Sequence, residues 1–214
     1  MINNLFNKPK IIGVVGDVNT GKSMTLYNIL EGLAENNTFN LYYYGLRLDF
    51  EKVASQRVYS VAELESIQDS IIIIDELSSL FDLDNRKIKK IIENTLRLIN
   101  HNNNVLILCG TPENFKKFLS AKVDVYAFKK CTLRDFINGS TSKNIINAYN
   151  GYEKGSEVLN LAIDEMLLFD GYHYEKKKVE YLEDYDSKQD NVSILQKRSK
   201  KCSKNVPEIV RYKK

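Results

Sequence analysis

The stretch GDVNTGKS, residues 16–23, constrains this chain more than any other part of its sequence. It satisfies the pattern G-x-x-x-x-G-K-[ST] through Gly16, Gly21, Lys22 and Ser23. The apolar run IIGVV precedes it and is typical of a buried parallel strand. Apolar residues recur at helical spacing from Ser23 to about Asn36. The sequence therefore predicts a strand, a glycine loop and a helix, in that order.

The residues of this loop suit the binding of a nucleoside triphosphate. Glycines let the backbone turn tightly and direct successive N–H groups at phosphate oxygens, and the helix N-terminus adds its positive dipole end. Lys22 is expected to reach the β and γ phosphates, and the Ser23 hydroxyl to bind Mg²⁺. A chance glycine-lysine turn is disfavoured by the strand and helix around it. The predicted ATP-binding residues are Gly16, Asp17, Val18, Asn19, Thr20, Gly21, Lys22, Ser23 and Met24.

A second candidate is the pair Asp75-Glu76, which ends the aliphatic run SIIIIDE. Ligands of open α/β sheets bind outside the carboxyl ends of the strands, so carboxylates here face the loop. Asp75 is expected to be the Mg²⁺ partner, and Glu76 to polarise the attacking water. The alternative is that both residues only cap the next helix. The chain has no N/T-K-x-D motif for recognising guanine, which counts against a small G protein.

Strand-like and helix-like segments alternate along the first two thirds of the chain. Strands are predicted at 41–46, 70–75, 105–111 and 123–130, and helices at 61–68, 86–100 and 112–120. This alternation predicts an α/β fold with a mostly parallel central sheet flanked by helices. We divide the chain into an ATPase core at 1–131, a β-rich extension at 132–185 that completes the sheet edge, and a flexible basic tail at 186–214. Within the extension, residues 144–153 and 156–171 are expected to be extended.

The charge, cysteine and apolar content of the chain restrict its partners and its compartment. Its net charge is +3, yet residues 197–214 hold eight Lys or Arg against one Glu, so the rest is mildly acidic. This basic tail suits salt-sensitive contact with DNA phosphates, or equally a solubilising or docking role. Cys109, Cys131 and Cys202 form no CxxC pair, which favours a reducing compartment, and no apolar run is long enough to span a membrane.

With GDVNTGKS, SIIIIDE and VLILCGT in that order, residues 10–130 resemble a minimal additional-strand ATPase. Within that class the chain is similar to the FtsK/HerA-like ATPases, which include viral genome-packaging enzymes and the Zot-like proteins of filamentous phages. The β-rich end FDGYHYEKKKVEY adds to this resemblance. It implies a ring of identical subunits that pumps double-stranded DNA, with a capsid or portal protein as a possible partner. It also implies a location in the host cytoplasm or in the virion.

The resemblance implies two further site residues. In this class a later strand lies between the loop strand and the acidic strand, and a polar residue at its tip senses the γ phosphate. Thr111 holds that position, although it suits equally the N-cap of a helix that begins at Pro112. FtsK/HerA-like proteins often have Gln there, whereas Cys109-Gly110-Thr111 is closer to large terminases. Arg97 is a candidate arginine finger toward a neighbouring subunit, or an ordinary solvated side chain.

Two other functions compete with DNA translocation. A nucleotide-switched assembly or export protein of the Zot-like type would hydrolyse ATP without responding to DNA. A small-molecule kinase would need an acceptor pocket near Arg47 and Arg57, and Glu76 beside Asp75 favours water as the acceptor. We expect no DNA cleavage, because the region after residue 132 lacks an obvious cluster of carboxylates.

Overall fold

The computed structural model describes residues 10–34, 40–44, 55–75, 77, 86–115, 117–133, 156–170 and 173–179 of the chain. Several predictions concern residues outside these ranges. They are the role of Glu76, the extended segment at 144–153 and the flexible tail from residue 186.

The fold is built on an eight-stranded sheet with the order β3-β2-β4-β5-β1-β6-β7-β8. Neighbouring strands are parallel from β3 to β6, and β7 and β8 are antiparallel additions. This confirms the predicted α/β fold with a mostly parallel sheet. The strands are β1 (Lys10–Val15), β2 (Asn40–Tyr44), β3 (Ser55–Arg57), β4 (Ser70–Ile74), β5 (Val105–Gly110), β6 (Val125–Phe128), β7 (Glu165–Phe169) and β8 (Tyr174–Lys178).

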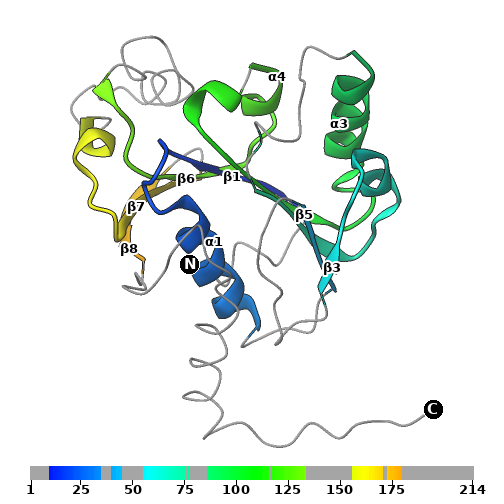
Figure 1. Ribbon diagram of the computed structural model, residues 1–214, viewed down its shortest axis with the longest axis horizontal. Helices are drawn as coiled ribbons and strands as arrows, with labels where there is room; N and C mark the ends of the chain where they lie inside the picture. Colours follow the sequence, from blue (N-terminus) through cyan, green and yellow to red (C-terminus); the bar gives the residue numbers. More distant parts are fainter. Residues whose placement is uncertain are drawn as a thin grey trace, which may run out of the picture.

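Helices cover both faces of this sheet (Figure 1). Helix α1 (Lys22–Ala34) lies on one face, where Met24, Leu26 and Ile29 join one hydrophobic core. Helices α3 (Arg86–Leu98) and α4 (Lys117–Ser120) lie on the other face and belong to a second core. The central strands β4, β5 and β6 are buried at every position, because both of their faces are covered. The short 3₁₀ helices are η2 (Val61–Ser66), η3 (Pro112–Asn114) and η4 (Ser156–Asn160).

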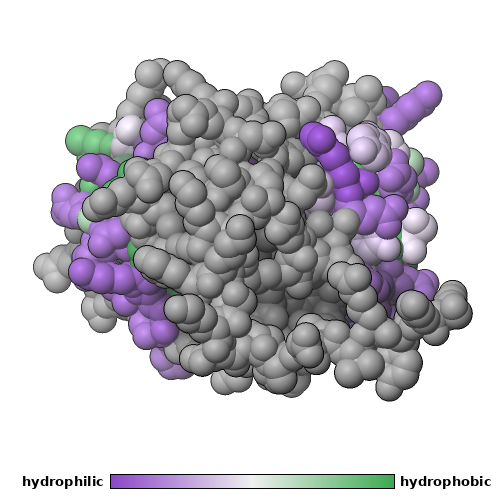
Figure 2. All heavy atoms as spheres, turned by 60° about the horizontal axis from the view of Figure 1, so that its bottom comes forward, coloured by the Kyte–Doolittle hydropathy of each residue, from purple (hydrophilic) through white to green (hydrophobic). Residues whose placement is uncertain are grey.

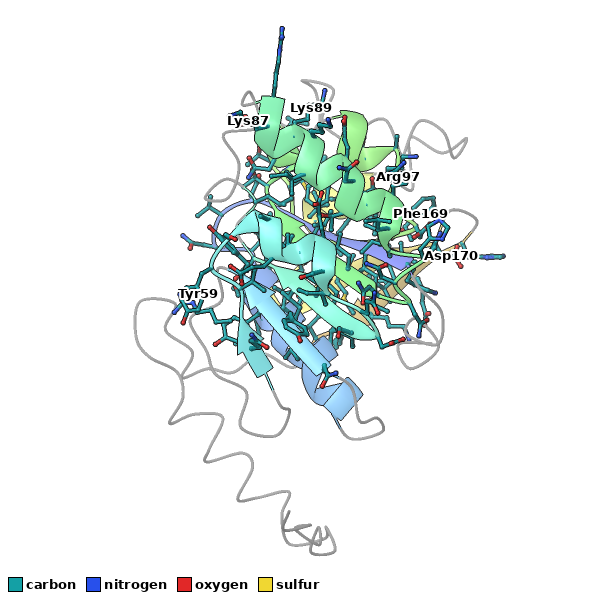
Figure 3. All side chains as sticks on the ribbon, turned by 90° about the vertical axis from the view of Figure 1, so that its right-hand side faces the viewer. Tyr59, Lys87, Lys89, Arg97, Phe169 and Asp170 are labelled. Atoms are coloured by element: carbon teal, nitrogen blue, oxygen red, sulfur yellow. The ribbon has the colours of Figure 1, made fainter. Side chains whose placement is uncertain are left out.

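Helix α3 confirms the helix predicted at 86–100, and it is amphipathic. Ile92, Thr95 and Leu96 are buried against the sheet and η2, whereas Arg86 and Arg97 are exposed. Figure 3 shows Lys87, Lys89 and Arg97 along this helix on the outside of the molecule. The polar face of α3 is therefore mainly basic.

The C-terminal extension continues the sheet instead of forming a separate layer. Strand β7 pairs with β6, and β8 pairs with β7, so the hairpin forms one edge of the sheet. Hydrophilic side chains gather at this edge, on the left in Figure 2. They include Lys176, whose ammonium lies 2.9 Å from a Glu165 carboxylate oxygen. The division of the chain at residues 131/132 and 185/186 stays a prediction.

Two local predictions need correction, and one strand was missed. Residues 156–171 are not extended throughout, because Ser156–Asn160 form η4 and the strand begins only at Glu165. Val158 and Leu161 are both buried, and a spacing of three suits a 3₁₀ turn better than the alternation of a strand. The helix predicted at 112–120 is divided into η3 and α4, because Phe115 leaves the helical conformation and packs its ring against Tyr126. The short strand β3 is polar and was not predicted.

Among the described residues, no helix has both the length and the apolar character needed to cross a bilayer.

Candidate nucleotide site

The glycine loop joins β1 to α1 at the carboxyl edge of the parallel sheet. Asn19 and Gly21 adopt positive φ angles of 61° and 83°, which turn the chain sharply before α1 begins. The Thr20 hydroxyl donates to the Asp17 carbonyl at 2.8 Å, and the Lys22 ammonium donates to the same oxygen at 2.7 Å. The Lys22 side chain therefore folds back toward the start of the loop.

The two glycines of the pattern are required for different reasons. A β-carbon on Gly21 would be strained by the positive φ angle and would lie 3.1 Å from the Ile163 carbonyl oxygen. Gly16 shows no positive φ, yet its β-carbon would lie 2.5 Å from Lys129 Cβ and 2.8 Å from Thr20 Oγ1. Gly16 is thus required by the close approach of Lys129, directly after β6, which the motif alone does not reveal.

Backbone hydrogen bonds fix the loop to its neighbouring strands. The Gly16 N–H donates to the Gly110 carbonyl at the end of β5, at 3.2 Å. The Asp17 N–H donates to the Lys130 carbonyl just after β6, at 3.0 Å. The loop is therefore held from both sides before any ligand binds.

Ser23 and Asp75 come together across the sheet. The Ser23 hydroxyl donates to Asp75 Oδ2 at 3.3 Å, and both groups are partly buried. Asp75 follows β4, and its N–H donates to the Tyr44 carbonyl at 3.0 Å, which fixes its backbone. Strand β5 separates β4 from β1, so the pair spans the gap over the end of β5.

This pair suits a Mg²⁺ ion in its chemistry. Mg²⁺ prefers oxygen ligands and is commonly held by one or two protein oxygens, phosphate oxygens and water. Among the described residues, no group of three or more His, Cys, Asp or Glu side chains is arranged to hold a metal. A hydroxyl and a carboxylate would therefore supply the protein ligands, and a bound phosphate and water would supply the others.

Thr111 follows β5 and occupies the N-cap position of η3, with a half-buried side chain. Its carbonyl accepts the Asn114 N–H at 3.0 Å, but its side chain makes no capping hydrogen bond. Because the preceding Gly110 carbonyl binds Gly16, Thr111 is placed beside the glycine loop. Thr111 is therefore an N-cap by backbone position only, and its role toward the γ phosphate stays a prediction.

The other predicted site residues are placed as follows. Val18 is 71% exposed at the outside of the loop, and the Met24 side chain is buried in the core between α1 and the sheet. Glu76 lies outside the described residues, between Asp75 and the buried Leu77. Arg97 is exposed in the last turn of α3. Since α3 leads back to the start of β5, this turn lies at the edge of the sheet opposite the loop, and the structure does not bring Arg97 to the site of its own chain.

Sequence reasoning missed Lys129, which directly follows β6. Its side chain has no exposed surface, and burial lowers its pKa to about 8 despite the nearby carboxylates of Asp164 and Glu165. Its ammonium donates to the carbonyls of Ile163 at 2.7 Å and Glu165 at 2.6 Å. The available signal was a lysine directly after the apolar run VYAF, where a strand approaches the loop.

The loop, the acidic residue after β4 and the insertion of β5 between β4 and β1 together define the fold of an additional-strand P-loop NTPase. The position of β5 confirms what the resemblance implied about the order of the strands.

Comparison with known proteins supports this assignment at the level of fold. The sequence matches no protein-family model and no curated protein. Two similar solved structures are the genome-packaging NTPase B204 of Sulfolobus turreted icosahedral virus 2 with sulfate and the DNA-packaging ATPase B204 of Sulfolobus turreted icosahedral virus. They share 15% and 17% identity with this chain, with TM-scores of 0.59 and 0.60. Both comparisons cover 82% of this chain, and 98% and 100% of the other.

A third similar structure is the pCW3 conjugation coupling protein TcpA with ATPγS. It has 18% identity and a TM-score of 0.54, and the match covers 90% of this chain and 66% of that one. B204 of the first virus has also been solved with ATPγS, at a TM-score of 0.58 and 16% identity. The resemblance to FtsK/HerA-like ATPases is thus confirmed at the level of the fold.

Proposed function

We propose that this chain is a Mg²⁺-dependent ATP hydrolase that drives the movement of double-stranded DNA and packages a viral genome. The observation that carries the proposal is the 3.3 Å contact between Ser23 and Asp75 beside the glycine loop. Phosphate loops occur in proteins of many different functions. The Ser23 hydroxyl and the Asp75 carboxylate, placed across the end of β5, add ligands that suit the metal ion of a bound triphosphate. The proposed place of action is the cytoplasm of the host cell, or the virion.

The proposed roles rest on the sequence motifs and, for the described residues, on where each one lies. The loop N–H groups hold the phosphates, and Lys22 exchanges its bond to the Asp17 carbonyl for bonds to the β and γ phosphates. Ser23 and Asp75 hold Mg²⁺, which neutralises phosphate charge. Glu76 orients the attacking water, and the Thr111 hydroxyl senses the γ phosphate. These roles are proposals, as is the binding of the loop residues to ATP.

The coupling to DNA has separate support. Two structures with the same fold are described as packaging enzymes, and a third as a conjugation coupling protein. The exposed face of α3 and residues 197–214 are rich in Lys and Arg, which bind phosphate backbones without regard to sequence. We propose a homo-oligomeric ring in which Arg97 of one subunit approaches the site of the next. A capsid or portal protein is the proposed docking partner.

The test is steady-state ATP hydrolysis with and without double-stranded DNA, at two salt concentrations. The proposal predicts hydrolysis that DNA stimulates, a weaker stimulation at high salt, and loss of turnover in Glu76→Gln. Hydrolysis that does not respond to DNA would instead favour the nucleotide-switched assembly protein. Absence of hydrolysis in the wild type under all conditions would contradict both.

A further inference from the structure

Lys129 occupies a position between the glycine loop and the C-terminal hairpin. Its N–H donates to the Val15 carbonyl at 2.7 Å, so it continues the pairing of β6 with β1 up to the start of the loop. Its side chain is fully buried. A lysine at such a position needs a physical reason, because burying an ammonium group is costly unless its hydrogen bonds are satisfied.

The ammonium end of Lys129 binds a turn that precedes β7. It donates to the carbonyls of Ile163 and Glu165, at 2.7 and 2.6 Å. The turn is closed by the Glu165 N–H, which donates to the Ala162 carbonyl at 3.0 Å. The Asp164 carbonyl accepts the Val179 N–H at 2.6 Å, which ties the turn to the end of β8 as well. Lys129 therefore holds a short segment that is itself well fixed to the hairpin.

The stem of Lys129 lies against both glycines of the loop. Its Cβ would be 2.5 Å from a β-carbon on Gly16, and its Cε 3.6 Å from one on Gly21. The Ile163 carbonyl, which the ammonium binds, would lie 3.1 Å from the same β-carbon on Gly21. One side chain thus fills the space between the phosphate loop and the turn, and connects them.

Packing alone does not call for a lysine here. A methionine would fill a similar volume without the cost of burying a charge. Lysine adds donors for the two carbonyls, which would otherwise face an apolar side chain, and a positive charge beside a loop of phosphate-binding pattern. The donors affect the position of the loop, and the charge affects its electrostatic potential.

We propose that Lys129 is a positioning residue of the nucleotide site. It holds the turn Ala162–Glu165 against Gly21 and so keeps the loop in the conformation that binds phosphate. The hairpin β7–β8, remote in sequence, thereby becomes part of the support of the site. This inference rests on the proposed function, because it requires the loop to bind a nucleotide.

The test is calorimetric titration of the full chain with Mg²⁺ and ATPγS, which gives affinity and stoichiometry together. Lys129→Met should raise the Kd about tenfold with unchanged stoichiometry, as losses of supporting contacts do at other ligand sites. A role in stability alone would lower the stoichiometry, because fewer molecules would be folded, and leave the Kd unchanged. Lys122→Met is the matched control, since Lys122 is exposed at the opposite end of β6.

A Kd for Lys129→Met within about twofold of the wild type would overturn the inference. That result leaves the proposed function intact, whereas failure of the wild type to bind ATPγS contradicts the proposed function itself. If Lys129→Met does not fold, hydrogen exchange of the wild type decides the inference.

Hydrogen exchange of the wild type gives a reading that needs no variant. ATPγS should protect the amides of residues 163–165 together with those of the loop. Protection of the loop alone would contradict the inference.

Discussion

The Ser23 hydroxyl donates to the Asp75 carboxylate at 3.3 Å, although the two residues are 52 positions apart in the sequence. Ser23 is in the first turn of α1, and Asp75 directly follows β4. The pair forms because β4 and β1 run parallel on either side of β5, so their carboxyl ends lie at one edge. The contact joins the two halves of the site through groups that both suit Mg²⁺.

Lys22→Ala should weaken binding of ATPγS about 10- to 100-fold, because it removes a charge-assisted hydrogen bond to phosphate. Stability without nucleotide should change little, since Lys22 makes only a partly buried bond to the Asp17 carbonyl. Calorimetric titration and thermal unfolding measure the two effects, with Lys122→Ala as the exposed control. Unchanged affinity would exclude Lys22 from the phosphate site.

Gly16→Ala should destabilise the fold by about 1–3 kcal/mol, the usual cost of overpacking. The new methyl group would lie 2.5 Å from Lys129 Cβ. Lys129 directly follows β6, and β6 cannot move away without breaking its pairing with β1. Urea unfolding measures the change, and Val18→Ala, at an exposed loop position, is the control. The same free energy of unfolding in Gly16→Ala and wild type would refute the close approach of Lys129.

Thr111→Ala should lower kcat for ATP hydrolysis without lowering the melting temperature. The Thr111 side chain makes no capping hydrogen bond, so its removal should not cost the roughly 1 kcal/mol of a lost N-cap. Turnover and thermal unfolding of the same preparation separate the two roles. A fall in melting temperature with unchanged kcat would show that Thr111 is a structural cap.

Lys129 should make stability depend on pH in the alkaline range. Its pKa is about 8 in the folded chain, against 10.5 for an ordinary lysine, so the unfolded chain holds the proton more tightly. Wild type should therefore gain stability as pH rises from about 8 to 10.5, by up to about 3 kcal/mol. The carboxylates of Asp164 and Glu165 act in the opposite direction on this pKa and are outweighed by burial.

Urea unfolding of wild type and Lys129→Met across this pH range measures that gain as the difference between the two proteins. A difference independent of pH would mean that Lys129 titrates normally in the folded chain.

The sequence was sufficient for the order of the parallel strands β1, β2, β4, β5 and β6, because local patterns determine them. Aliphatic runs such as SIIII and VLILCG predict strands buried on both faces, and β4 and β5 are such strands. The glycine loop and the position of Asp75 follow from a motif and from the rule that parallel strands end at one edge.

The remaining features depend on contacts between distant residues, which no local pattern contains. The burial of Lys129 arises from carbonyls more than 30 positions further along the chain, at Ile163 and Glu165. The requirement for Gly16 arises from β6, and the break between η3 and α4 from the packing of Phe115 on Tyr126. The local sequence can mark such a residue, as the run VYAF does for Lys129, but it does not show which distant groups the residue will contact.

The most direct test of the site is the Mg²⁺ dependence of ATPγS binding in wild type and Asp75→Asn, measured by calorimetric titration. If Ser23 and Asp75 hold the metal of a bound triphosphate, Mg²⁺ should tighten binding to the wild type and have much less effect in Asp75→Asn. An equal effect of Mg²⁺ on both proteins would contradict a metal site at Asp75, and with it the proposed mechanism.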